Sequence, residues 1–254
     1  MAHAVVHFEI GGPDDLRLAE FYADLLGWRV RPVPDVDYAL IDTTGGAGIN
    51  GGIEPTAAGA QSVTVYVQAD DLQAVLDKVN LLGGKTVTPI TELPGMATYA
   101  KFEDLDGLVI GLVLGPEDSE QAPGATAPTD AVAPGPSAGS GAPVDWFELL
   151  GADPDRTQRF YAEIFGWRVT AAEQGYRLIE TGSVRGIPGG IATGIPGSWA
   201  TVYARVQDVA GTLERAAALG GGREYGPRVA GSGMQVGAVR DPAGNVLGIY
   251  SRLG

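Results

Sequence analysis

The sequence predicts an α+β protein of two tandem domains, each made of two β-α-β-β-β modules. The stretch "HFEIGGPDDLRLAEFYADLLGWRV" begins at His7, and a close copy, "WFELLGADPDRTQRFYAEIFGWRV", begins at Trp146. A length of 254 residues also favours two domains over one. Between the copies, a segment rich in Ala, Pro, Gly and Ser lacks the large apolar side chains that a core needs. We therefore expect domains at residues 2–116 and 144–254, joined by a linker at 117–143.

The residue pattern of the first module accounts for each of its elements. Residues 4–10 are mostly β-branched and aromatic, which predicts a strand. Residues 13–27 open with proline and two aspartates, place apolar side chains at helical spacing and end on glycine, which predicts a helix. Short strands at 28–33 and 37–43 and a glycine-rich segment at 45–53 complete the module.

The same order of elements recurs along the chain. The second module of the first domain is predicted to form a strand, a helix and three strands at 62–70, 71–84, 85–90, 95–104 and 108–114. In the second domain, the copy of the first module is followed by a strand, a helix and two strands at 199–208, 209–221, 233–241 and 245–251. Four modules therefore make up the chain outside the linker.

Composition and charge exclude several classes of partner. The chain has 17 Lys and Arg against 31 Asp and Glu, and its net charge of -14 would repel nucleic acid and anionic lipid. It has no cysteine, which removes disulfides, thiolate metal sites and cysteine nucleophiles and is typical of a reducing compartment. Neither a secretory leader nor an apolar run long enough to span a membrane is present. We expect a soluble, cytoplasmic protein whose partner is a small molecule.

The modules resemble those of the vicinal oxygen chelate superfamily, which includes glyoxalase I, bleomycin-resistance proteins and extradiol dioxygenases. The resemblance rests on the pattern H-x13-FY…LGW that starts at His7 and on the turns "EDLDG" and "RDPAGN" before the last strand of each domain. It covers all of the chain except the linker, and the tandem layout with "DWFEL" and "FGWRV" is similar to a two-domain glyoxalase-like subgroup. The resemblance implies that each domain forms an open, cup-shaped mixed β barrel with flanking helices.

The resemblance also implies where a metal ion would bind. Family members take ligands from the first and last strands of each module, commonly a histidine first and a glutamate last. The matching positions of the first domain hold His7, Asn50, Thr64 and Gly111, and those of the second hold Trp146, the turn "GIPGGI", Thr201 and Gly248. A catalytic zinc needs about three protein ligands. We therefore expect neither a metal nor another cofactor, with His7 making a local hydrogen bond or touching a ligand.

Strand alternation places polar side chains on the inner face of each cup. In the first domain these are His7, Glu9, Thr64, Tyr66 and Gln68. In the second they are Trp146, Glu148, Thr201, Tyr203 and Arg205. Two interpretations are open for the glutamates: each can be a general acid or base with a raised pKa, or a structural group in a Glu9–Gln68 hydrogen bond and a Glu148–Arg205 ion pair.

Two functions are compatible with this pattern. One is a metal-independent protein that sequesters an antibiotic or an apolar metabolite against Tyr66, Tyr203 and Trp146. The other is a lyase, isomerase or hydroxylase that uses Glu9 or Glu148, or an atypical metal site in which Tyr99 or Asn50 joins His7 and Glu9. The tandem copy also predicts a monomer whose two domains pack together as an intramolecular pseudo-dimer.

Overall fold

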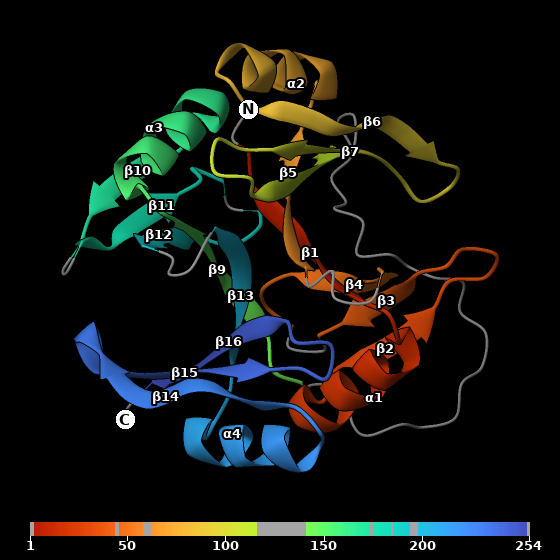
Figure 1. Ribbon diagram of the computed structural model, residues 1–254, viewed down its shortest axis with the longest axis vertical. Coiled ribbons are helices and arrows are strands. Elements are labelled where there is room, and N and C mark those ends of the chain that lie inside the picture. The colour runs from red at the N-terminus through yellow and green to blue at the C-terminus, as the bar shows by residue number, and fades with distance from the viewer. Residues whose placement is uncertain are drawn as a thin grey trace.

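The computed structural model describes residues 3–43, 46–57, 62–115, 141–172, 175–183, 185–193 and 198–252. The predicted linker at 117–143 lies outside these ranges except for its last three residues. Two similar α+β halves lie on either side of it in the sequence (Figure 1).

The first half contains eight strands and two helices among the described residues. Its first module comprises β1 (Val5–Gly12), α1 (Asp15–Leu26), β2 (Arg29–Pro32), β3 (Ala39–Asp42) and β4 (Asn50–Pro55). Its second module comprises β5 (Ser62–Ala69), α2 (Leu72–Leu81), β6 (Lys85–Leu93), β7 (Ala97–Glu103) and β8 (Val109–Leu114).

The second half repeats this order, with one additional 3-10 turn. Its first module comprises β9 (Val144–Gly151), α3 (Pro154–Phe165), β10 (Arg168–Ala171), β11 (Arg177–Glu180) and β12 (Gly189–Thr193). Its second module comprises β13 (Trp199–Arg205), α4 (Val209–Ala218), β14 (Gly222–Ala230), the 3-10 turn at Gly231–Gly233, β15 (Met234–Arg240) and β16 (Val246–Arg252).

Each half forms one open, mixed, eight-stranded sheet. The strand orders are β2-β3-β4-β1-β5-β8-β7-β6 and β10-β11-β12-β9-β13-β16-β15-β14, so the two sheets have the same topology. The first strands of the two modules, β1 and β5, pair antiparallel at the centre, and β4 and β8 flank them in parallel. The predicted α+β fold of paired modules is confirmed, and the edge strands of each sheet do not close into a barrel.

Helix ends follow from the residues that the sequence places there. Asp14 caps α1 by accepting a hydrogen bond from the backbone N–H of Arg17, and Asp153 caps α3 in the same way. Gly27 and Gly166 end these helices in the left-handed region, at φ of 70° and 69°, where a side chain would be strained. The repeated helix motif therefore specifies both ends of the element.

In each half, the helix of the first module packs against the helix of the second module of the other half. Helix α1 contacts α4 of the other half, and α2 contacts α3 (Figure 1). The hydroxyl of Tyr22 on α1 donates to Asp241 at 2.9 Å, and that of Tyr161 on α3 donates to Asp104 at 2.8 Å. These tyrosines belong to the "FY" motif and these aspartates open the "DLDG" and "DPAGN" turns. The two repeated motifs therefore meet each other across the interdomain interface.

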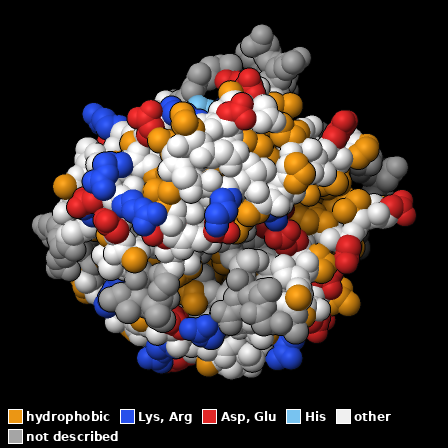
Figure 2. Space-filling view, turned by 45° about the horizontal axis from the view of Figure 1, so that its top comes forward, with side chains coloured by type: hydrophobic (Ala, Val, Ile, Leu, Met, Phe, Trp, Pro, Cys, Tyr) orange, Lys and Arg blue, Asp and Glu red, His pale blue; other side chains and the backbone are white. Residues whose placement is uncertain are grey.

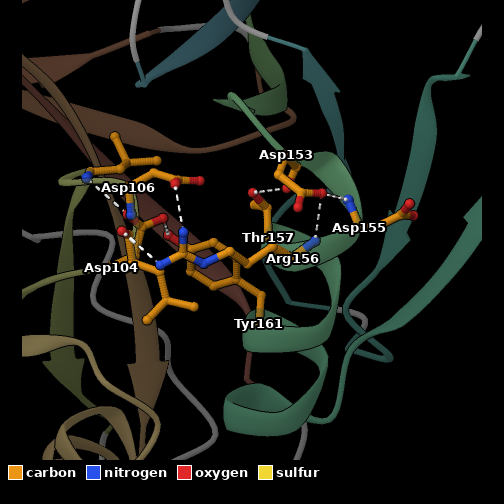
Figure 3. Close-up of polar contacts among 9 residues, drawn as sticks. Asp104, Asp106, Asp153, Asp155, Arg156, Thr157 and Tyr161 are labelled. Carbon is orange, nitrogen blue, oxygen red and sulfur yellow. Dashed lines mark hydrogen bonds and ion pairs between the residues drawn. The ribbon is translucent and has the colours of Figure 1, made fainter.

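Figure 3 shows one of these two junctions. Arg156 on α3 donates to the carbonyl oxygen of Leu105 at 3.1 Å and lies 3.6 Å from the carboxylate of Asp106. Burial raises the pKa of Asp104, and the hydrogen bonds from Leu108, Asp106 and Tyr161 oppose that shift. An open groove of about 610 Å³ lies beside this junction, lined by residues that include Leu82, Leu105 and Phe160.

The repeated tryptophans Trp28 and Trp167 also join the two halves. Trp28 donates its indole N–H to the carbonyl oxygen of Ala142, and Trp167 donates to that of His3, both at 2.7 Å. Trp28 stacks on Tyr22, and Trp167 stacks on Tyr161. Both tryptophans are nearly fully buried, as expected for residues that pack in the core and between domains.

The surface in Figure 2 carries interspersed charges. Lys and Arg side chains lie among Asp and Glu, so the described part of this face has no continuous basic surface of the kind that binds phosphate backbones. None of the helices in the described ranges is both long enough and apolar enough to cross a bilayer.

Candidate functional site

A buried carboxylate lies at the centre of the first sheet. Glu9 on β1 accepts a hydrogen bond from the hydroxyl of Tyr66 on β5, and the hydroxyl of Tyr38, before β3, also interacts with Glu9. The ammonium of Lys101 on β7 lies 3.2 Å from Glu9 and 2.9 Å from Glu54 on β4. With His7, whose Nε2 lies 2.8 Å from the Tyr38 hydroxyl, we call these six residues the first cluster.

Burial and neighbouring charges together set the charge states of the first cluster. It lowers the pKa of His7 to about 4, so this imidazole is neutral near pH 7. Burial alone would lower the pKa of Lys101, but the charges of Glu9 and Glu54 outweigh it and raise that pKa, which keeps the ammonium charged. Burial, followed by the charge of Glu9, raises the pKa of Glu54. The cluster therefore contains its own cation between two carboxylates.

The second sheet has a related cluster. Glu148 on β9 accepts hydrogen bonds from Tyr176 at 2.8 Å and from Tyr203 at 2.7 Å. The indole N–H of Trp146 donates to the Tyr176 hydroxyl at 3.1 Å, and the hydroxyls of Tyr203 and Tyr225 lie 3.0 Å apart. We call these five residues the second cluster. Burial raises the pKa of Glu148, and the bonds from Tyr203 and Tyr176 and the charge of Arg228 oppose this shift.

The two clusters share a common plan set by strand register. Glu9 pairs with Gly52 on β4 as Glu148 pairs with Gly190 on β12, and His7 pairs with Tyr66 as Trp146 pairs with Tyr203. The equivalent pairs are Glu9 and Glu148, Tyr38 and Tyr176, Tyr66 and Tyr203, and His7 and Trp146. Each ring of the last pair is hydrogen-bonded to a tyrosine hydroxyl, His7 to Tyr38 and Trp146 to Tyr176, so tryptophan keeps the contact that histidine makes.

Glycines on the neighbouring strands make room for these tyrosines. A Cβ atom on Gly111 would overlap the ring of Tyr66, and one on Gly248 would overlap the ring of Tyr203. A Cβ on Gly52 would likewise overlap the hydroxyl of Tyr38. Gly111 and Gly248 stand at the positions where the superfamily resemblance implies a glutamate ligand. In this chain a phenol ring from the adjacent strand fills that space.

These residues do not fit a divalent metal ion. Across the described ranges, no group of three or more His, Asp or Glu side chains is placed to hold one. In the first cluster the Lys101 ammonium already lies between Glu9 and Glu54. Asn50, considered above as an extra ligand, instead accepts hydrogen bonds from Thr43. A metal would have to displace a cation and the hydrogen bond from Tyr66 at Glu9.

Several predicted site residues lie outside the clusters. Arg205 pairs with Asp145 at 3.5 Å, so the expected Glu148–Arg205 ion pair is wrong. The β9–β13 register skips Asp145 between Trp146 and Val144, so this extra residue on β9 lies near the end of β13, where Arg205 meets its carboxylate. Gln68 lies against Gly115 at the end of β8, and Glu9 bonds tyrosines and lysine rather than Gln68.

Three other predicted residues lie on the expected strands but outside the two clusters. Thr64 is buried opposite Glu9, and Thr201 donates to the backbone carbonyl of Val246 at 2.8 Å. Tyr99 lies on β7 two residues before Lys101. The remaining predicted residues, His7, Glu9, Tyr66, Trp146, Glu148 and Tyr203, are brought together in the two clusters.

Sequence reasoning missed five residues of the clusters. Tyr38 and Tyr176 had a detectable signal, because aligning the two halves matches "YALID" with "YRLIE". Glu54, Lys101 and Tyr225 had none, since the two halves carry different residues at these places. Strand register aligns Lys101 with Ala238. Lys101 pairs with Gly111 and Ala238 pairs with Gly248, and each of these glycines contacts a tyrosine ring.

Comparison with known proteins is consistent with this geometry. Residues 144–249 match the family model for the Glyoxalase/Bleomycin resistance protein/Dioxygenase superfamily. The second domain belongs to this superfamily. The first domain has the same strand order and motif positions, and the resemblance found in the sequence is confirmed. The chain is 28% identical over 251 residues to CFP32 of Mycobacterium bovis, named as a candidate glyoxylase, with 93% of this chain and 90% of that protein covered.

Solved structures share the fold at low sequence identity. The Mn(II)-bound glyoxalase from Novosphingobium aromaticivorans has a TM-score of 0.68 and 17% identity, covering 100% of this chain and 83% of that one. The 2,3-dioxygenase LapB from Pseudomonas sp. KL28 has a TM-score of 0.67 and 14% identity, covering 99% and 92%. The shared superfamily fold therefore supports different site chemistries.

Proposed function

We propose that this protein is a metal-independent small-molecule-binding protein of the glyoxalase/bleomycin-resistance type, which sequesters an apolar or aromatic compound in the cytoplasm. The observation that carries the proposal is that the ring of Tyr66 packs against Gly111 and the ring of Tyr203 packs against Gly248. In both halves a phenol ring takes the place of the expected last-strand ligand and holds the central glutamate. The lack of cysteine supports the proposed compartment.

The second cluster is the better candidate for the binding site. The other side chains of the two clusters are similarly exposed, but Glu9 is only 9% exposed and has a lysine partner, whereas Glu148 is half-buried and has no ion-pair partner among the described residues. Aromatic side chains that combine an apolar ring with a polar tip are common in ligand sites. We therefore assign ligand binding to the second cluster and a structural role to the first.

Native mass spectrometry with elemental analysis of freshly purified protein tests the proposal. We expect far less than one metal ion per chain, and a retained small molecule whose occupancy is unchanged by a chelator. Tyr203→Phe should reduce this occupancy, and Tyr66→Phe, the matched change in the other half, should not. About one zinc, iron, nickel or manganese per chain, with binding or activity that a chelator abolishes, would show that the proposal is wrong.

An acid–base enzyme is the second candidate, and the raised pKa of Glu148 favours it. A carboxylate that retains its proton at higher pH can exchange protons with a bound substrate. This alternative predicts a turnover that survives chelation and disappears in Glu148→Gln, whereas simple sequestration predicts loss of binding without any turnover in the wild type.

A further inference from the structure

Hydrogen-bond directions in the second cluster all point toward Glu148. Tyr203 donates its only hydroxyl proton to Glu148, so Tyr225 must be the donor in the bond between the two tyrosines. Tyr176 donates to the other carboxylate oxygen and accepts from Trp146. Every N–H and O–H of these four aromatic side chains is therefore used within the cluster. What remains available to a ligand from the cluster is acceptor capacity on Glu148, because Arg228 already interacts with the Tyr225 hydroxyl.

In the first cluster, a lysine side chain supplies the donor that the second cluster lacks. There the Lys101 ammonium donates to the same Glu9 oxygen that accepts from Tyr66, and it also lies 5.7 Å from the centre of the Tyr66 ring. In the second half, register places Ala238 at the position of Lys101 and Ala192 at that of Glu54. Among the described residues, Glu9 thus has an ammonium in contact with it, whereas Glu148 has only the more distant positive charge of Arg228.

We propose that the second cluster binds an organic cation whose ammonium or amidinium group donates to Glu148 beside the ring of Tyr203. The inference deepens the proposed function, on which it rests, by naming the ligand class. The cation contributes the donors that this cluster lacks and an interaction with the surrounding aromatic rings, which is strongest for desolvated cations. The net charge of -14 adds a long-range attraction for such a ligand.

Arg228 lies at the solvent-exposed edge of the second cluster. Its guanidinium lies 4.4 Å from the centre of the Tyr225 ring, and the residue is exposed on β14. Its positive charge disfavours a second cation nearby. Removing this charge should therefore strengthen the binding of a cationic ligand, whereas a neutral ligand would be little affected and an anionic one would bind less well.

Titration with n-butylammonium chloride, followed by backbone amide NMR shifts of the full chain, tests the inference. We expect saturable shifts in β9, β13 and β16. Glu148→Gln should weaken binding by about tenfold or more, the size expected for a charge-assisted hydrogen bond. Glu224→Gln removes a carboxylate that pairs with Arg240 outside the cluster, and should change the affinity by less than about twofold. Arg228→Ala should bind more tightly than the wild type.

A second variant creates the missing site in the other half. Lys101→Ala removes the internal ammonium, so n-butylammonium should then also shift amides of β1, β5 and β8. If this variant does not fold, the wild type and Glu148→Gln still decide the question. Butyrate at equal ionic strength should give no saturable shifts in either cluster.

The result that overturns the inference differs from the one that overturns the proposed function. A retained neutral or anionic molecule in the second cluster, with no saturable shifts from n-butylammonium, would refute the organic cation and leave metal-independent binding intact. Equal affinity in wild type and Glu148→Gln would also refute the inference. Stoichiometric metal in the purified protein would instead refute the proposed function.

Discussion

Replacing His7 with glutamine should remove a large part of the protein's sensitivity to mild acid. Burial lowers the pKa of this imidazole from 6.5 to about 4. A folded-state pKa below the unfolded value means that the unfolded chain binds the proton more readily. The stabilising contribution is therefore complete above about pH 6.5 and is lost as the pH falls toward 4.

The two pKa values fix the size of this effect. At about pH 5, nearly all unfolded chains carry the proton on His7 and few folded ones do, which corresponds to a loss of roughly 2 kcal/mol relative to neutral pH. Glutamine retains an N–H that can donate to Tyr38 but does not titrate. The wild type should thus lose roughly 2 kcal/mol more than His7→Gln between about pH 7 and about pH 5.

Urea denaturation of both proteins at the two pH values measures this difference. Subtracting the two losses removes contributions from groups that titrate in both proteins, such as Glu54. His3→Gln replaces the other histidine of the chain and shows whether a change in acid sensitivity is specific to His7. Equal acid losses in wild type and His7→Gln would refute a neutral His7, and so would a resonance assigned to His7 that titrates near pH 6.5.

Further predictions concern packing, charge and the domain interface. Gly248→Ala should lower the free energy of unfolding by about 3 kcal/mol because its Cβ overlaps the Tyr203 ring, and a double-mutant cycle with Tyr203→Ala should show that most of this cost depends on the ring. Lys101→Met should cost about 3 kcal/mol in urea denaturation, since it leaves two carboxylates without their cation, and a near-neutral effect would contradict the geometry. Tyr22→Phe and Tyr161→Phe should each cost about 1 to 2 kcal/mol, with similar values because they are equivalent interdomain contacts. Light scattering at micromolar concentration should show a monomer, and an obligate dimer would be evidence against internal pairing of the two halves.

The sequence by itself determined the repeated architecture. Helix starts at aspartate, helix stops at glycine and alternating strands are local patterns, so the four modules and the α+β class could be predicted. The two central glutamates and the tyrosines of β5 and β13 could also be placed, because strand alternation puts residues two apart on one face. The expectation that no metal ion binds rests on the same count of positions and stays a prediction.

Only the tertiary structure decided what surrounds each glutamate. Tyr38, Tyr176 and Lys101 reach Glu9 or Glu148 from strands or loops that are distant in sequence, and periodicity within one element carries no information about such partners. The β9–β13 irregularity inserts Asp145 on β9 near Arg205, and an inserted residue cannot be predicted from strand alternation. The difference between the clusters likewise appeared only when register aligned Lys101 with Ala238, because a cation's effect depends on which carboxylate its side chain reaches in space.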